Sequence, residues 1–189
     1  MPNYTIFVEG KADKKFIQDI LLKMFNNKDM AEIIPICSNS IYAQIPNIKK
    51  HIDSGRSIIV IFDADNNPQI IKDNIKKTES EIKSKIKYFL FPDNKSNGAL
   101  EDLLLLCINA SHKKIIDCFD KYKLCIQNAD NRYSLPGKKA MVYAYCEALS
   151  IDGSDIKEID RNYLNQNIWD LDSPSLNDLY RFLNSAIKI

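Results

Sequence analysis

The chain has 189 residues, and its 26 lysines and arginines nearly cancel its 25 aspartates and glutamates, so the formal net charge is +1. Hydrophobic residues make up 45% of the sequence, which is the balance of an ordinary globular protein. The small net charge argues against a strongly basic protein that wraps nucleic acid, but it leaves room for a local basic patch.

The first half of the chain alternates between strand patterns and helix patterns. Short apolar runs predict strands, and apolar residues spaced by three and four predict the helices between them. The predicted order is strand 4–8, helix 11–25, strand 32–37, helix 41–52 with an interruption at Pro46, strand 57–62, helix 69–87 and strand 88–91. Pro35 favours an edge position for the second strand. Such alternation is typical of a parallel sheet with helices on both faces.

Helical patterns dominate the second half. The predicted helices are 99–109, 111–122, 138–149, 155–165 and 174–187, and the polar segment 127–137 is expected to be an exposed loop. We therefore predict an α/β protein with two parts. Residues 1–110 form a core around a four-stranded, mainly parallel sheet, and residues 111–189 form a helical extension packed on it.

Several classes of protein are disfavoured by what the sequence lacks. The longest apolar run, 103–108, is far shorter than the about 20 residues of a membrane span, and the N-terminus lacks the layout of a signal peptide. The five cysteines contain no CxxC pair, which argues against a disulfide framework or a zinc ribbon and favours a reducing cytoplasm. Neither glycine-rich nucleotide-binding motif is present, so an ATPase site on the usual loop is not expected.

Acidic residues follow the predicted parallel strands at the points where they end. Glu9 ends the first strand, Asp63 and Asp65 follow the third, and Asp93 follows the fourth. Asp13 lies in the first turn of the helix after Glu9. Because parallel strands end at one edge of the sheet, these carboxylates are expected to gather in one region.

Gathered carboxylates repel one another, so such a cluster either keeps some of its acids protonated or holds a cation. Oxygen ligands without a neighbouring histidine or cysteine favour Mg²⁺ or Mn²⁺ over zinc. A divalent cation converts a region that repels phosphate into one that attracts it. Metal-assisted phosphoryl chemistry with one or two ions is the natural use of such a site.

Each acidic position also has an ordinary interpretation. Residues 63–68 (Asp-Ala-Asp-Asn-Asn-Pro) are rich in turn formers, and Asp13 suits the first turn of a helix because of the helix dipole. Glu9-Gly10 is compatible with a simple turn at a strand end. The joint arrangement, rather than any single residue, favours a metal site.

Two of these motifs together resemble the Toprim domain, the metal-binding module of topoisomerases, DnaG-type primases, overcoming-lysogenization-defect nucleases and ribosomal-RNA maturation nucleases. The residues concerned are 8–13 (Val-Glu-Gly-Lys-Ala-Asp) and 62–65 (Phe-Asp-Ala-Asp), within a region of resemblance that covers about 4–91. Segments 90–94 and 98–104 also resemble a bacterial family of stand-alone Toprim-related proteins. The resemblance implies a Toprim-like Rossmannoid fold.

The resemblance also implies roles for individual residues. Glu9 would act as a general acid or base or as a metal ligand, and Asp63 and Asp65 would coordinate Mg²⁺. Asp13 corresponds to the extra acid of the nuclease branch, which binds a second metal, and Glu101 is a further candidate ligand whose alternative role is that of a first-turn helix acid. The chain has no ATPase segment and no zinc-finger cysteines, so a complete topoisomerase or primase is excluded.

Lysines supply the candidate phosphate contacts. Lys138 and Lys139 open a predicted helix, where ammonium groups and free backbone N–H groups both attract phosphate. Nuclease-type Toprim sites need a basic group near the leaving oxygen, and either lysine would supply it. Lys11 flanks the proposed metal site. The alternatives are a solvated helix start for the pair and an exposed helix face for Lys11.

These observations together predict Mg²⁺- or Mn²⁺-dependent cleavage of phosphodiester bonds in DNA or RNA by a cytoplasmic protein that does not bind membranes. The alternative is a non-catalytic module that binds Mg²⁺ and a nucleotide, or a subunit of a defence or repair complex with a separate ATPase.

Overall fold

A four-stranded sheet forms the centre of the protein, for which the computed structural model describes residues 3–150 and 157–188. The strands are β1 (Tyr4–Val8), β2 (Ala31–Pro35), β3 (Ser57–Asp63) and β4 (Lys87–Phe91). They pair in the order β2-β1-β3-β4, and every pair is parallel. The predicted α/β class is confirmed, and so is the edge position of the strand that contains Pro35.

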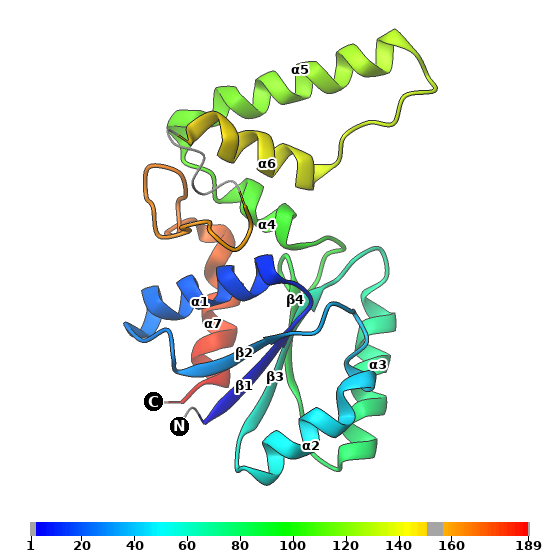
Figure 1. Cartoon of the computed structure of the whole chain (residues 1–189), viewed down its shortest axis with the longest axis vertical. Coiled ribbons are helices and arrows are strands. Elements are labelled where there is room, and N and C mark those ends of the chain that lie inside the picture. Colours follow the sequence, from blue (N-terminus) through cyan, green and yellow to red (C-terminus); the bar gives the residue numbers. More distant parts are fainter. Residues whose placement is uncertain (1–2, 151–156, 189) are drawn as a thin grey trace.

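Helices connect the strands and then continue to the C-terminus (Figure 1). Their bounds are α1 (Lys11–Phe25), α2 (Ile45–Asp53), α3 (Pro68–Ile82), α4 (Leu100–Leu106), α5 (Lys113–Ala129), α6 (Lys138–Leu149) and α7 (Asn177–Ala186). Short 3₁₀ turns at Ile41–Gln44, Ala110–His112 and Pro174–Leu176 precede α2, α5 and α7. Pro46 lies in the first turn of α2, where its missing N–H leaves no hydrogen bond unmade, so it starts a helix rather than interrupting one.

Both faces of the sheet are covered. Ile6 and Val8 of β1 belong to a buried cluster with residues of α1 and α7, whereas Phe7 belongs to a second cluster with residues of α2 and α3. This alternation follows from the two-residue period of a strand. β3 is buried on both sides, as its continuous apolar run predicts.

One predicted helix, 155–165, is wrong over the part of it that the structure describes. Residues 155 and 156 lie outside the described residues, and residues 157–165 form turns. The side chains of Asn162 and Asn165 accept hydrogen bonds from the backbone N–H groups of Leu164 and Asn167, at 3.1 and 3.0 Å. Such local bonds compete with helical ones, so the asparagines favour turns despite the apolar spacing.

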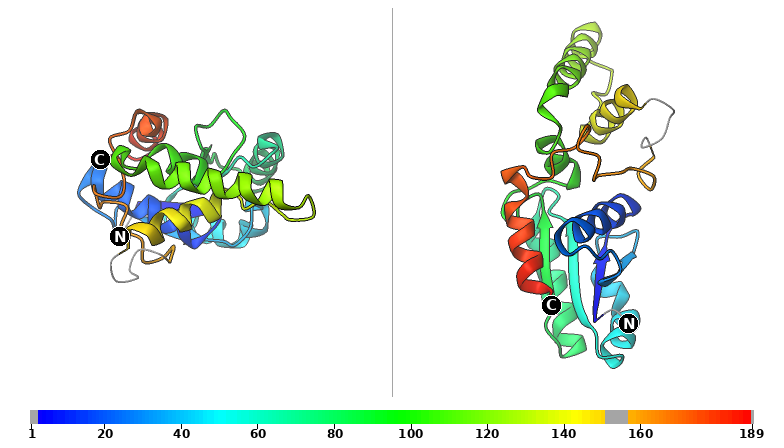
Figure 2. Two further views of the ribbon diagram at one scale, coloured as in Figure 1. Left: turned by 90° about the horizontal axis from the view of Figure 1, so that it is seen from above. Right: turned by 90° about the vertical axis from the view of Figure 1, so that its left-hand side faces the viewer.

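The C-terminal half divides between the sheet and a projecting hairpin. α7 returns to the sheet, where the Nζ of Lys87 donates to the carbonyl oxygen of Ala186 at 2.9 Å. α5 and α6 lie beyond the carboxyl ends of the strands (Figures 1 and 2), and the predicted boundary at residue 110 falls just before α5. Within the described residues, no helix combines the length and the apolar character that a membrane crossing requires.

Candidate functional site

The carboxyl ends of β1 and β3 place two acidic side chains next to each other. Glu9 directly follows β1, and Asp63 is the last residue of β3, which pairs with β1. The Oε1 atom of Glu9 accepts a hydrogen bond of 3.0 Å from the backbone N–H of Asp63. Oδ1 of Asp63 in turn accepts a bond of 2.8 Å from the N–H of Leu100, the first residue of α4. Backbone groups of two strand ends and a helix start therefore hold both carboxylates.

Asp13 reaches the same region from the first turn of α1. Its Oδ2 accepts a hydrogen bond of 2.7 Å from the N–H of Gly10, which satisfies a donor that the helix leaves free. A side chain at position 10 would place its Cβ 3.1 Å from that oxygen, so glycine allows the carboxylate to close over the turn. The Asp13 side chain is buried.

These acids line one pocket of about 370 Å³ at the carboxyl edge of the sheet. Its charged lining consists of five acids and two lysines: Glu9, Asp13, Asp63, Glu101, Glu158, Lys11 and Lys139. Residues 37–39, which follow β2, form one wall of the pocket. The backbone N–H of Cys37 donates to the carbonyl oxygen of Glu9 at 2.7 Å, and this bond holds the wall beside Glu9. Of the five acids that were expected to gather at this edge, the pocket brings together Glu9, Asp13 and Asp63, and it does not include Asp65 or Asp93.

The pocket raises the pKa values of its central acids. Burial raises the pKa of Glu9 to about 7, and the charges of Asp65 and Asp13 add to the effect. Burial likewise raises the pKa of Asp63 to about 8, with further contributions from Asp13 and Glu9. The pKa of Asp13 is raised by burial and then by Glu101 and Glu158. A cation would favour the charged forms of all three.

The donor chemistry of the pocket fits a hard divalent cation, since its five acids offer only oxygen ligands and no histidine lines it, and its one possible sulfur ligand is the thiol of Cys37 on one wall. Within residues 3–150 and 157–188, however, no three Asp, Glu, His or Cys side chains converge closely enough to hold a metal ion. Side-chain rotation would therefore be required before three carboxylates could reach one ion at about 2.0–2.1 Å, the usual Mg²⁺ distance.

Asp65 and Asp93 occupy different positions from the central acids. Asp65 is exposed and does not line the pocket, and its backbone pairs with Gly98 through bonds of 2.8 and 3.0 Å. The Asp93 carboxylate accepts bonds from the N–H and the hydroxyl of Ser96, at 2.7 and 2.8 Å, and so organises its own loop. The role of Asp65 as a metal ligand stays a prediction; through its charge it raises the pKa of Glu9.

The predicted lysines lie at or beside the pocket, and two of them form ion pairs. Lys139 contacts Glu158 at 2.7 Å, and the pair lines the pocket. Lys138 pairs with Asp102, whose Oδ2 accepts a 3.0 Å bond from the N–H of Ala99 and so caps α4. Lys11 is exposed and lines the pocket without an ion-pair partner among the described residues.

Sequence reasoning missed Glu158, Asp102 and the wall that follows β2. The wall had a usable signal, because residues 37–39 come directly after a parallel strand and so meet the same edge of the sheet. Glu158 had no such signal, since it belongs to no strand end and lies in a segment that was wrongly predicted to be helical. Asp102 follows Glu101 in the first turn of α4, and its capping of that helix was the usable signal.

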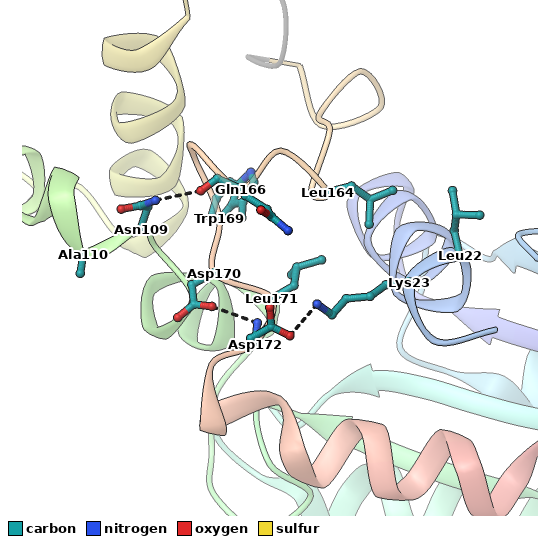
Figure 3. A pocket seen from close by; sticks show the side chains of 10 residues that line it. All are labelled: Leu22, Lys23, Asn109, Ala110, Leu164, Gln166, Trp169, Asp170, Leu171 and Asp172. Carbon is teal, nitrogen blue, oxygen red and sulfur yellow. Dashed lines mark hydrogen bonds and ion pairs between the residues drawn. The ribbon is translucent and has the colours of Figure 1, made fainter. Parts of the chain in front are cut away.

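A second groove lies beside the C-terminal half of α1, away from the first turn that lines the acidic pocket, and has a different character (Figure 3). Its volume is about 520 Å³, and its lining is Leu22, Lys23, Asn109, Ala110, Leu164, Gln166, Trp169, Asp170, Leu171 and Asp172. Asp172 is neutralised by Lys23 at 2.7 Å, and the side-chain amide of Asn109 donates to the carbonyl oxygen of Gln166 at 2.8 Å. The carboxylate of Asp170 accepts a hydrogen bond of 2.9 Å from the backbone N–H of Asp172, so this groove has two carboxylates and one ion pair where the acidic pocket has five acids.

Comparison with known proteins adds one finding. A family model with the description "Protein of unknown function (DUF3226)" matches residues 3–188, which is nearly the whole chain. No curated protein matches the chain, and no solved structure does.

Proposed function

The chain belongs to the family described as a protein of unknown function (DUF3226), and we propose that it is a Mg²⁺- or Mn²⁺-dependent nuclease that hydrolyses phosphodiester bonds in DNA or RNA. One observation carries this proposal: Glu9, Asp13 and Asp63 come from separate parts of the sequence and share one pocket at the carboxyl edge of a parallel sheet. The order of these acids along the chain supports the resemblance to the Toprim nucleases.

The acids of the pocket would have two roles, metal binding and proton transfer. Glu9, Asp13, Asp63 and Glu101 are the residues that would hold one or two ions. When bound, a divalent cation supplies charge neutralisation for the phosphate and acidifies water. Glu9, with a pKa raised to about 7 by burial, is suited to accept a proton from the attacking water near neutral pH.

The lysines would orient the substrate and stabilise the leaving oxygen. Lys11 is exposed at the pocket and attracts the phosphate. Lys139 lies in the pocket, but it would first have to exchange Glu158 for the phosphate. Lys138 would have to leave Asp102 in the same way. The pocket therefore has one lysine ready for a phosphate, Lys11, whereas Lys139 in the pocket and Lys138 beside it become available only when their ion pairs open.

These ion pairs favour one alternative, in which the pocket binds Mg²⁺ and a nucleotide without cleaving anything, alone or as a subunit beside a separate ATPase. With Lys138 and Lys139 both paired, the pocket can bind a phosphate while neither of these two lysines is free to stabilise a leaving oxygen. Cleavage assays separate the two functions.

We also propose that the protein works in the reducing cytoplasm. All five cysteines are free thiols, and they are divided between the surface and the interior. Such thiols are typical of proteins that are kept in a reducing compartment.

The decisive experiment incubates the purified chain with labelled DNA and RNA in Mg²⁺, Mn²⁺ or EDTA. We expect cleavage that needs the metal and that falls at least about 100-fold in Glu9→Gln and in Asp63→Asn, as expected for the loss of a group that acts directly in the reaction. Glu81→Gln, which removes an exposed acid on α3, is the matched control and should leave the rate unchanged.

Two results would overturn the nuclease proposal. Cleavage that persists in both pocket variants would belong to a contaminant. Tight Mn²⁺ binding without cleavage of any DNA or RNA, single- or double-stranded, would favour the non-catalytic alternative.

A further inference from the structure

The hairpin of α5 and α6 is built differently from the rest of the protein. We call residues 113–149 the arm; it comprises α5, the loop 130–137 and α6. None of the α5 residues is buried, and the helix packs mainly on α6. Figures 1 and 2 show the arm extending away from the sheet. Most of α5 therefore contributes little to the core and is available for contacts with another molecule.

The arm is also the basic part of the chain. Residues 113–149 contain seven lysines and arginines and four aspartates and glutamates, a net charge of +3. The remaining residues carry 19 basic and 21 acidic side chains, a net charge of −2. The overall charge of +1 thus conceals a separation between a basic arm and an acidic body, and a basic surface of this kind attracts polyanions.

α5 has one face against α6 and one that is uncovered. Ile115, Ile116 and Phe119 are partly buried, as the inner face of an amphipathic helix should be. Cys118, Tyr122 and Cys125 recur at spacings of four and three and are exposed, with Tyr122 54% exposed. This spacing places them in one stripe, which borders the inner face because Tyr122 lies seven residues after Ile115 and its ring meets that of Phe119 edge-on, with centroids 5.8 Å apart.

Lysines border the exposed aromatic groups of the arm. Lys114 and Lys121 of α5 are exposed and have no ion-pair partner among the described residues. The loop after α5 adds a second exposed aromatic ring, Tyr133, which is 60% exposed and follows Arg132. Lysines that neutralise phosphates and aromatic rings that stack on bases are the two elements of a surface for single-stranded nucleic acid.

We propose that the arm binds single-stranded nucleic acid, with the backbone phosphates against Lys114 and Lys121 and with bases stacked on Tyr122 and Tyr133. This inference rests on the proposed function, because the bound strand would be the substrate of the acidic pocket. The arm leads to that pocket, since α6 begins with the lysines that pair with Asp102 and Glu158.

The positive charge of the arm favours a nucleic acid, rather than a second copy of the chain, as the molecule that contacts the Tyr122 stripe. Two α5 helices packed through the Tyr122 stripe would bring two arms of charge +3 together, and the unpaired lysines beside the stripe would repel one another. A polyanion turns the same lysines into favourable contacts and releases its own counterions. The uncovered face therefore suits a nucleic acid better than its own copy.

The test uses fluorescence anisotropy in EDTA to measure the binding of labelled single-stranded DNA and RNA. Each strand has roughly 20 nucleotides, which is longer than a single binding site of this kind. We expect Tyr122→Ala/Tyr133→Ala to weaken binding at least about 30-fold, as the loss of two stacked bases predicts. Lys114→Gln/Lys121→Gln should lower the slope of log K against log salt by about 1.4, since each phosphate contact to a single strand contributes about 0.7. Lys49→Gln/Lys50→Gln on α2 is the matched control and should change neither quantity.

The outcomes separate the arm from the pocket. Asp63→Asn should bind strands as the wild type does while losing cleavage. If the wild type hydrolyses the small phosphodiester bis(p-nitrophenyl) phosphate with Mg²⁺ but arm variants and controls bind strands equally, the arm proposal fails and the nuclease stands. If the arm variants lose binding while no phosphodiester is cleaved, the arm proposal stands and the nuclease fails. A dimer in light scattering that Tyr122→Ala dissociates, with strand binding unchanged, would assign the stripe to a second copy.

Discussion

The acidic pocket and the basic arm place their charges in opposite physical settings. In the pocket, Glu9, Asp13 and Asp63 lie at the ends of packed elements, and each accepts a hydrogen bond from a backbone N–H. Burial and mutual repulsion raise their pKa values. On the arm, Lys114 and Lys121 stand in solvent on a helix without a buried residue.

This difference separates two tasks. A group that takes part in chemistry works best with a fixed position and a perturbed pKa. Because its charged form is disfavoured where it is held, it lowers the stability of the metal-free fold. A group that attracts a flexible polyanion needs only charge and exposure. Substitutions in the pocket should therefore change both chemistry and stability, whereas substitutions on the arm should change binding alone.

The largest expected effect is on metal affinity. Asp63→Asn should weaken Mn²⁺ binding at least about 100-fold, because a neutral amide at the centre of the pocket removes both a ligand and a charge. Calorimetric titration of the wild type and the variant measures the change. Asp172→Asn, in the groove of Figure 3, is the control and should bind Mn²⁺ like the wild type. Equal affinities in all three proteins would remove the pocket from consideration as a metal site.

The next effect concerns the backbone that supports the pocket. Gly98 has a φ of +144°, and a Cβ at this position would lie 2.8 Å from Oδ2 of Asp102. Gly98→Ala should therefore lower the free energy of unfolding by about 2–3 kcal/mol, because of strain and the loss of space for a capping carboxylate. Gly55→Ala, which also has a positive φ but meets no atom within 4 Å, isolates the backbone term. Chemical denaturation should rank Gly98→Ala as the less stable, and the reverse order would contradict this account.

The pocket should also make stability depend on pH. The folded-state pKa values of Glu9 and Asp63, about 7 and about 8, exceed the ordinary values of 4.5 and 3.8 that apply to the unfolded chain. Between about pH 5 and about pH 8 the folded protein therefore holds protons that the unfolded chain has released, so metal-free stability falls as pH rises. Thermal unfolding in EDTA measures this. Asp63→Asn should flatten the curve, and a profile that rises over this range would refute the raised pKa values.

Much of the fold and of the pocket could be predicted because both follow from the ends of regular elements. The bounds predicted for β1, α1 and α6 agree with those observed, since apolar spacing is clear in all three. The strand-end rule then brought Glu9 and Asp63 together, because parallel strands share an edge.

The other features of the pocket and of the arm depend on interactions that the spacing of apolar residues does not predict. Glu158 reaches the pocket from a segment in which asparagine side chains replace helical hydrogen bonds. The exposure of Tyr122 depends on which face of α5 meets α6, and an amphipathic pattern alone does not show that the side chains at the border of that face stay uncovered.

The smallest expected effect is on the stability of the arm variants. It tests directly whether the arm, unlike the pocket, can be altered with little loss of stability. Tyr133→Ala should change the free energy of unfolding by less than about 0.5 kcal/mol, and Tyr122→Ala by no more than about 1.5 kcal/mol, because more than half of each side chain is already in water and Tyr122 loses one edge-on contact with Phe119. Phe16→Ala, a buried aromatic of α1, is the contrast and should cost about 3–5 kcal/mol. Urea denaturation measures all three. If either tyrosine variant lost nearly as much stability as Phe16→Ala, that tyrosine would belong to the core. It would then not be available to bind a strand of nucleic acid.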